Sequence, residues 1–194
     1  MAAQNHIKIL GPALVLFASA FLMLSGCVTT PQYECQINEA KAKTLDLATH
    51  YVQQPRTLAF GPLPRGILAE ATLYRLSIGD TKIHPCQIIT IHKQLYLRRN
   101  RAADLRFKET REFFAEDGTL IATNTEDLTN QLRDSGSYSA AIPLPIPRTA
   151  PQGEYLIVSR LWLQRRGDRH SYQLGRAEAA FRILPLRRPK ASPH

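Results

Sequence analysis

Cysteine, histidine and acidic side chains are the groups in this sequence that could carry out chemistry. The histidines show no metal-ligand spacing, and no Gly-x-Ser-x-Gly turn, phosphate-binding glycine loop or His-Glu-x-x-His helix is present. Glu116 and Asp117 precede Gly118, where a solvated turn accounts for two adjacent acids. The sequence therefore predicts no catalytic site and no metal site.

Cys27 stands in a more specific setting. It follows Leu24-Ser25-Gly26, which closes an uncharged stretch of 16 residues from Ile9, with Lys8 before it. Positive, then apolar, then small is the layout of a secretory signal, and 16 residues fall short of the roughly 20 that cross a bilayer as a helix. An uncleaved anchor running on through Val28 is the alternative.

The segment Leu24-Ser25-Gly26-Cys27 resembles the lipobox of bacterial lipoproteins. The resemblance implies that residues 1–26 are a signal peptide removed before Cys27, and that Cys27 carries the lipid. Two or more acyl chains hold a protein stably on a membrane leaflet. Val28, in place of the aspartate that retains such proteins at the inner membrane, implies export to the outer membrane. The domain would then face the periplasm on a short tether, residues 27–32.

Cys35 and Cys86 remain once Cys27 carries lipid. Two leftover thiols in an exported domain predict one disulfide, with free thiols as the alternative. A metal site is disfavoured, because two cysteines without Cys-x-x-Cys spacing make a poor tetrahedral set. The bridge closes a loop of about 50 residues, worth roughly 4 kcal/mol by loop entropy.

Positive charge is localised within a formal net charge of +9. Residues 160–190 hold nine lysines and arginines against two acids, and residues 98–111 hold six against two. Arginine binds phosphate and carboxylate groups bidentately, so the loop arginines Arg165, Arg166 and Arg169 are the predicted anion site. The expected partner is an envelope protein or an anionic polymer. Nucleic acid is excluded by the exported location and by the lack of aromatic interleaving. Ordinary solvation of strand faces is the alternative for these arginines.

The chain between the ends changes periodicity once. Apolar residues at helical spacing predict one amphipathic helix over about 33–53, ended by Pro55. Alternating patterns after residue 66 then predict strands over 71–78, 89–98, 105–116, 137–146, 155–164 and 172–183.

Two of these strands carry further expectations. Asp117-Gly118 predicts a two-residue hairpin loop that pairs Glu116 with Thr119 and Phe114 with Ile121. The strand that starts at Tyr155 is apolar on both faces and is expected at the centre of the fold.

About seven strands in one domain predict a mainly β fold, an antiparallel β-sandwich with the helix on an edge or open end. The run from Pro151-x-Gly153-x-Tyr155 to a last strand ending Ala-x-Phe-x-Ile resembles the closing strands of bacterial immunoglobulin-like domains. Trp162 lacks the cysteine pair of that family, so the resemblance extends to architecture alone. We expect a single domain over 33–185 and a basic, disordered tail over 186–194.

The sequence thus favours a non-enzymatic outer-membrane lipoprotein that acts as a structural or docking module. It carries no expected cofactor beyond the lipid on Cys27. An assembly lipoprotein of a secretion or surface apparatus is the alternative within binding roles. An envelope hydrolase would need a cleft with perturbed carboxylates, and a small-ligand-binding lipoprotein would need a closed apolar pocket.

Overall fold

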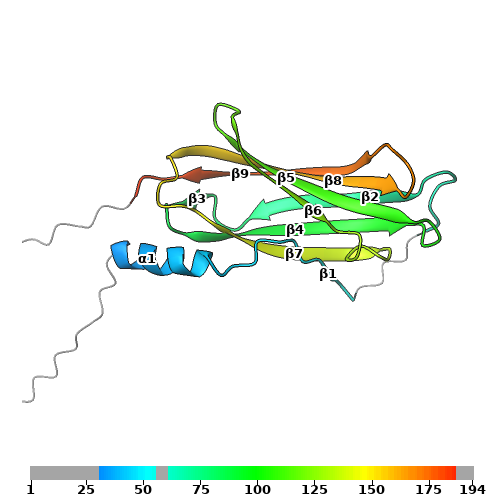
Figure 1. The fold of residues 1–194 in the computed structure, drawn as a ribbon, viewed down its shortest axis with the longest axis horizontal. Coiled ribbons are helices and arrows are strands. Elements are labelled where there is room, and N and C mark those ends of the chain that lie inside the picture. Colours follow the sequence, from blue (N-terminus) through cyan, green and yellow to red (C-terminus); the bar gives the residue numbers. More distant parts are fainter. Residues whose placement is uncertain (1–30, 56–60, 187–194) are drawn as a thin grey trace, which may run out of the picture.

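The chain folds as a sandwich of two β-sheets with one helix at its edge (Figure 1). The computed structural model describes residues 31–55 and 61–186. The predicted lipobox, the lipidation site Cys27, the tether up to residue 30 and the tail from residue 187 lie outside this part. One sheet has the order β1-β7-β4-β2 and the other β3-β9-β8-β5-β6, and every pairing except β3 with β9 is antiparallel. The predicted antiparallel β-sandwich is confirmed.

The elements follow in chain order. They are α1 (Pro31–Ala42), β1 (Val52–Gln53), β2 (Ala69–Ile78), β3 (Lys82–Ile83), β4 (Ile88–Arg99), β5 (Leu105–Ala115), β6 (Leu120–Asp127), β7 (Gly136–Pro145), β8 (Gly153–Arg165) and β9 (Tyr172–Ile183). Among the described residues no helix is long and apolar enough to cross a membrane.

The two ends of the sandwich are distinct (Figure 1). What we call the helix end holds α1, the tip of the β5–β6 hairpin and the turn before β8. What we call the loop end holds residues 61–67 and the loops that join β4 to β5, β6 to β7 and β8 to β9. The described chain begins and ends, at Pro31 and Leu186, on the helix end.

The helix is shorter than predicted. It ends at Ala42, where the Thr44 amide and hydroxyl both donate to the Lys41 carbonyl. Beyond this point tertiary contacts replace helical hydrogen bonds, because the Tyr51 N–H donates to the Gln131 side chain at 2.7 Å. The prediction of helix up to residue 53 was wrong, since the apolar spacing after Ala42 serves contacts of an irregular segment with the sheets.

The β5–β6 hairpin forms at the predicted place in a different register. The Ala115 N–H donates to the Thr119 carbonyl, and Phe114 lies opposite Leu120, not Ile121. The loop therefore has three residues, with Gly118 at φ +80°. A glycine in this left-handed position closes a three-residue hairpin loop with a bulge, which the two-residue prediction did not include.

The position of β8 follows its apolar sequence. This strand lies between β9 and β5, at the centre of the five-stranded sheet, as predicted.

The proline-rich end of β7 is tolerated because β1 pairs only with Tyr138 and Ser139, so no strand needs the missing donors at Pro143 and Pro145.

The apolar interior consists of two clusters along the sandwich. Leu95, Leu97 and Phe107 belong to the cluster nearer the loop end. Ile91 and Ile157 belong to the cluster nearer the helix end. Alternation along each strand sends these side chains inward, and β2, β4, β7 and β8 each contribute to both clusters.

Candidate functional site

The predicted anion-binding arginines lie at the loop end. Arg165 is the last residue of β8, and Arg166 and Arg169 lie in the exposed turn that follows. The Arg166 backbone N–H donates to the Asp104 carbonyl at 2.9 Å, and its guanidinium pairs with the Asp104 carboxylate at 3.1 Å. This turn is therefore held against the loop between β4 and β5.

The second basic cluster reaches the same end through β4. Arg101, in the loop after β4, pairs with Asp134 at 2.5 Å and keeps most of its side chain exposed. The Arg99 guanidinium donates to the Leu132 and Ala103 carbonyls and lies 5.3 Å from the centre of the Phe107 ring. Burial lowers the pKa of Arg99, and its guanidinium donates to two loop carbonyls, so this arginine closes the loops.

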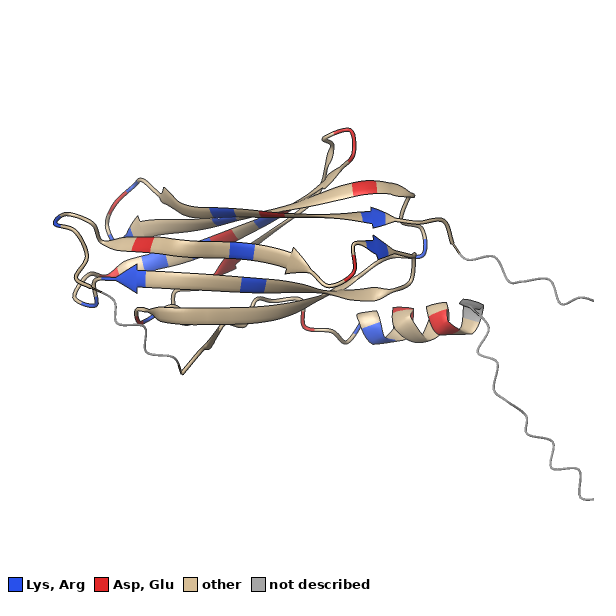
Figure 2. Cartoon of the chain, turned by 180° about the vertical axis from the view of Figure 1, so that it is seen from behind, with Lys and Arg blue, Asp and Glu red and all other residues tan. Residues whose placement is uncertain are grey.

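The two basic clusters, separate in the sequence, thus meet around the β4–β5 loop. Figure 2 shows Lys and Arg, interspersed with acids, at the end away from α1. A hollow of about 700 Å³ opens there, lined in part by Arg65, Arg99 and Arg101. Within the described part of the chain, these exposed arginines of the loop end form no ion pair: Arg65, Arg133, Arg165 and Arg169.

Arg111 does not belong with these surface cations. It is 4% exposed, and its guanidinium pairs with Glu126 at 2.9 Å. The same carboxylate accepts the Thr49 backbone N–H at 2.7 Å. The apparent basic cluster over 98–111 is therefore partly interior, because alternation along β5 turns Arg111 inward.

A buried polar layer separates the two apolar clusters, and the sequence analysis missed it. Lys93 of β4 and Glu109 of β5 form an ion pair across the two sheets, with side chains 0% and 2% exposed. Glu109 also accepts the Ser159 hydroxyl at 2.7 Å, and Ser159 bonds the Tyr74 hydroxyl at 2.8 Å. Lys93 Nζ donates to the Thr49 hydroxyl at 3.3 Å. A signal was present, since Lys93 stands at an inward position between Ile91 and Leu95.

The layer is closed to solvent. Desolvation, with a smaller effect of the Arg111 cation, lowers the pKa of Lys93 well below its usual range, while Glu126 opposes the shift. Burial likewise raises the pKa of Tyr74 to about 12. Such a cluster of ionisable groups is typical of active sites, but a substrate cannot reach this one. Its role is to join the two sheets.

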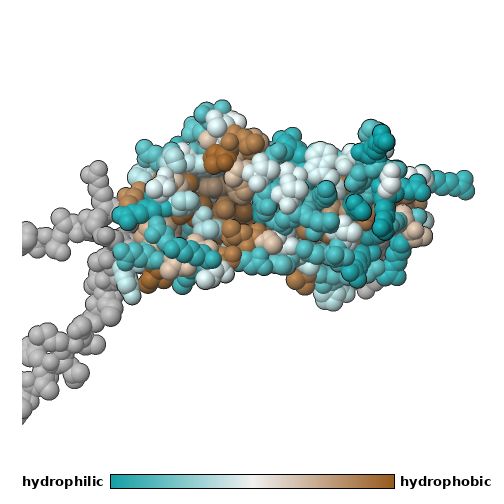
Figure 3. Space-filling model, in the orientation of Figure 1, coloured by the Kyte–Doolittle hydropathy of each residue, from teal (hydrophilic) through white to brown (hydrophobic). Residues whose placement is uncertain are grey.

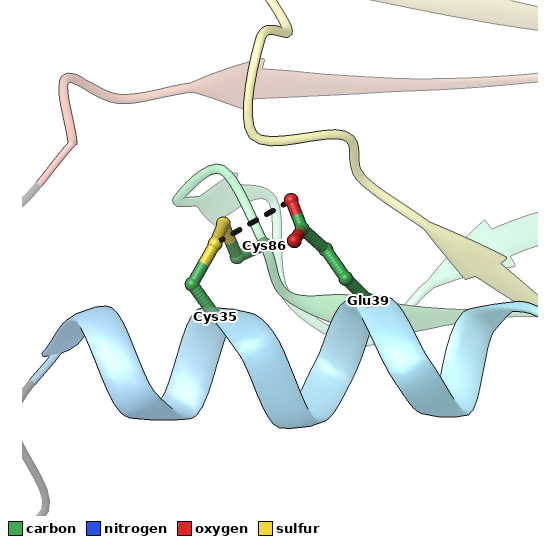
Figure 4. The surroundings of a disulfide bond; sticks show 3 residues. All are labelled: Cys35, Glu39 and Cys86. Atoms are coloured by element: carbon green, nitrogen blue, oxygen red, sulfur yellow. Dashed lines mark hydrogen bonds between the residues drawn. A yellow bond between two sulfur atoms is a disulfide. The ribbon is translucent and has the colours of Figure 1, made fainter.

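The predicted disulfide between Cys35 and Cys86 is confirmed (Figure 4). It links α1 to the segment before β4, with Cα atoms 4.9 Å apart. Cys86 has a φ of 70°, and its backbone N–H donates to the Ile146 carbonyl at 2.9 Å. A residue with a side chain in this left-handed region costs of order 1–3 kcal/mol and is held by its surroundings. The disulfide thus fixes α1 to the helix end of both β4 and β7.

Glu39 lies beside this disulfide. A carboxylate oxygen of Glu39 is 3.9 Å from Cys35 Sγ, so three potential metal ligands are close together. A disulfide offers no thiolate, and the thiolate is the form of cysteine that binds metal. The arrangement is therefore structural.

No protein-family model and no curated protein matches this chain. Solved structures similar to it include the C-terminal domain of wzt, with 9% identity over 72% of this chain and 80% of that one, at a TM-score of 0.44. The CARDB domain of a Pyrococcus furiosus protein is similar at 10% identity over 62% and 96% of the two chains, with a TM-score of 0.41. A family 123 glycoside hydrolase from Clostridium perfringens matches at 17% identity and a TM-score of 0.35, and 60% of this chain spans 24% of that enzyme. The fold class of this chain follows from its own strand pairing.

Proposed function

We propose that this chain is a lipid-anchored docking module of the bacterial outer membrane. Cys27 carries the acyl chains, and the arginines of the loop end bind anionic groups of an envelope polymer or partner protein. The module is non-enzymatic. The observation that carries this proposal is that two basic clusters, separate in the sequence, meet at the end of the sandwich opposite α1.

The geometry supports an anchor at one end and a binding surface at the other. Three residues lie between Cys27 and Pro31, and the four steps from one Cα to the next span at most about 14 Å when extended. The Cys35–Cys86 bridge fixes α1 to the sandwich, so the leaflet would lie beside the helix end. The loop end would then face away from the membrane, toward the periplasm.

Arg165 and Arg169 are the arginines best placed to bind an anion, because the neighbouring arginines already have partners. Arg99 is bonded to backbone carbonyls, and Arg101 and Arg166 each pair with one aspartate. Arg165 and Arg169 have no such partner among the described residues and remain exposed. An exposed guanidinium group without an ion-pair partner binds carboxylate or phosphate bidentately.

The experiment uses full-length protein with Arg165, Arg166 and Arg169 changed to Glu. Cosedimentation with isolated peptidoglycan sacculi, and separately with lipopolysaccharide vesicles, measures binding. We expect the triple variant to bind at least tenfold more weakly to one of the two. The wild-type binding should also fall as salt is raised from 50 to 300 mM, because salt screens exposed charges.

The matched control reverses three exposed cations elsewhere, Arg75, Lys82 and Arg148. It changes the net charge equally and should bind like the wild type. Equal loss of binding in both variants would show that net charge alone explains the effect. No loss of binding in either variant would contradict the binding role. In parallel, Cys27→Ser should abolish palmitate labelling; retained labelling would contradict the anchor.

A further inference from the structure

An apolar cleft opens at the helix end, on the side of the β5–β6 hairpin. It encloses about 660 Å³ between that hairpin and residues 144–151, and Figure 3 shows the apolar surface beside the projecting tip. Phe113, Tyr155 and Phe181 belong to its lining, and the last two rings stack with centres 5.5 Å apart. Leu144 and Ile121 belong to its sides. Exposed apolar surface of this kind marks interaction sites in soluble domains.

The cleft exists because the two sheets are not covered equally along this side. Strand β4 pairs with one edge of β7 along its whole length, but β1 is two residues long and covers only Tyr138 and Ser139 on the other edge. In the second half of β6 the Glu126 side chain is half-buried and receives hydrogen bonds from Thr49 and Arg111. The first half of β6, residues 120–123, is exposed.

The edge of β6 is open to pairing. Within the described residues β6 pairs with β5 alone, so its other edge leaves backbone donors and acceptors free. Proteins usually blunt such edges with short strands, lysine or proline. Strands β1 and β3 are short in this way, whereas β6 has eight residues with neither lysine nor proline. An extended segment added here would lie directly beside the cleft, because Ile121 and Ala122 line it.

The rim of the cleft is acidic. Glu116, Asp117 and Glu154 lie on it, and a Glu116 oxygen accepts the Glu154 backbone N–H at 3.3 Å. Arg182 approaches Glu154 at 3.9 Å, while Glu116 and Asp117 have no ion pair in the described chain. A ligand with a positive charge beside its apolar groups matches this rim.

We propose that β6 and the apolar cleft receive an extended segment of a partner protein. The segment adds to the exposed edge of β6 as a strand, places alternate apolar side chains in the cleft and sets a lysine or arginine against Glu116 and Asp117. Strand addition of this kind draws affinity from main-chain hydrogen bonds and specificity from side-chain pockets. A second copy of β6 fits less well, because it brings Glu126 and Asp127 and no basic residue. This proposal does not depend on the role of the loop end.

The experiment pans a random decapeptide phage library against purified full-length protein. We expect a consensus of alternating apolar residues flanked by lysine or arginine. A fluorescent synthetic peptide of that consensus then gives the Kd by anisotropy. Ile121→Arg should weaken binding at least tenfold, and so should replacing the basic flank of the peptide by glutamate.

Ser77→Arg is the matched control, because Ser77 is exposed on β2, outside both β6 and the cleft lining. It should bind the peptide like the wild type. Ile121 is 53% exposed, so its replacement leaves the core intact, and an unchanged Tm verifies this. As an independent readout, a benzophenone-bearing peptide should cross-link to residues 120–123.

Three outcomes would overturn the proposal. The first is the absence of a consensus, or binding that Ile121→Arg leaves unchanged. The second is a wild-type dimer by light scattering that Ile121→Arg converts to monomer, which would make a second copy the occupant. The third is binding of a fluorescent fatty acid, lost in Ile121→Arg, with no peptide binding, which would make the cleft a lipid site.

Discussion

The loop end and the helix end of the sandwich differ in how they are closed. At the loop end, guanidinium groups of Arg98 and Arg99 donate to backbone carbonyls and close the loops with polar contacts. At the helix end a covalent bridge holds α1, and the sheets part around an apolar cleft with an acidic rim. The same two sheets therefore carry a basic surface and an apolar surface at opposite ends. Between them, the polar layer around Lys93 and Glu109 joins the sheets.

The largest expected effect comes from breaking this shared layer. Glu109→Ala leaves Lys93 buried without its carboxylate, and losing one partner of a buried ion pair costs about 3–5 kcal/mol. Because the layer borders both apolar clusters, both ends should lose stability together. Urea unfolding followed by circular dichroism measures the change.

The control for Glu109→Ala is the double variant Lys93→Met with Glu109→Leu. It removes both charges and keeps the volume, so it should recover most of the lost stability. A single Glu109→Ala variant as stable as the wild type would show that the pair does not join the sheets.

Removing the disulfide should destabilise the helix end more than the loop end. The double variant Cys35→Ser with Cys86→Ser should lower the free energy of unfolding by about 4 kcal/mol, since the bridge spans 51 residues. In native-state hydrogen exchange, amides next to the bridge, such as that of Cys86, should exchange faster. Amides of the loop end should change less. Uniform acceleration at both ends would contradict the assignment of the bridge to the helix end.

Arg99→Met tests the opposite end. It leaves the carbonyls of Leu132 and Ala103 without their donor, and an unsatisfied buried polar group costs about 1–3 kcal/mol. Hydrogen exchange should accelerate in the loops after β4 and β6, with the Cys86 region unaffected. Arg101→Met, whose side chain is 78% exposed, is the control and should cost less than half as much. Equal effects of the two changes would remove the distinction between a closing and an exposed arginine.

The elements that sequence patterns predicted well are those with strict alternation. Strands β4, β5, β7 and β9 follow from alternating apolar residues, and the central place of β8 follows from its apolar sequence. The disulfide follows from the cysteine count and the expected export. The end of α1 was not predictable from spacing alone, because the backbone N–H groups of Tyr51 and Thr49 donate to Gln131 and Glu126, which are distant in sequence. The polar layer was missed because a charged residue is ordinarily assigned to the surface. Lys93 could have been recognised from its place between two inward apolar residues.

The convergence of the basic clusters depends on topology. The loops that hold Arg101 and Arg166 meet because β5 and β8 are neighbours, and no local pattern contains that pairing. The apolar cleft depends on where β1 stops, which is equally a tertiary outcome.

The smallest expected effect is the response of the acidic rim to pH. Hydrogen bonds from the Thr119 backbone and side chain lower the pKa of Asp117 below its ordinary 3.8. Because the folded pKa is the lower one, the stabilisation is present above 3.8 and is lost as the pH falls through the folded value. The Thr119 amide resonance should therefore titrate with a midpoint below 3.8. Asp117→Asn should remove this titration, and a midpoint at or above 3.8 in the wild type would contradict the hydrogen bond.

In the proposed function, the loop end binds the envelope while the opposite end is anchored. The most direct measurement is photo-cross-linking in intact cells, with a benzophenone amino acid in place of Arg169 or, as the control, of Arg75. We predict a discrete envelope adduct from position 169, none from position 75, and loss of the adduct when Cys27 is also changed to Ser. Adducts of equal yield from both positions, or an adduct at 169 that persists without Cys27, would contradict it.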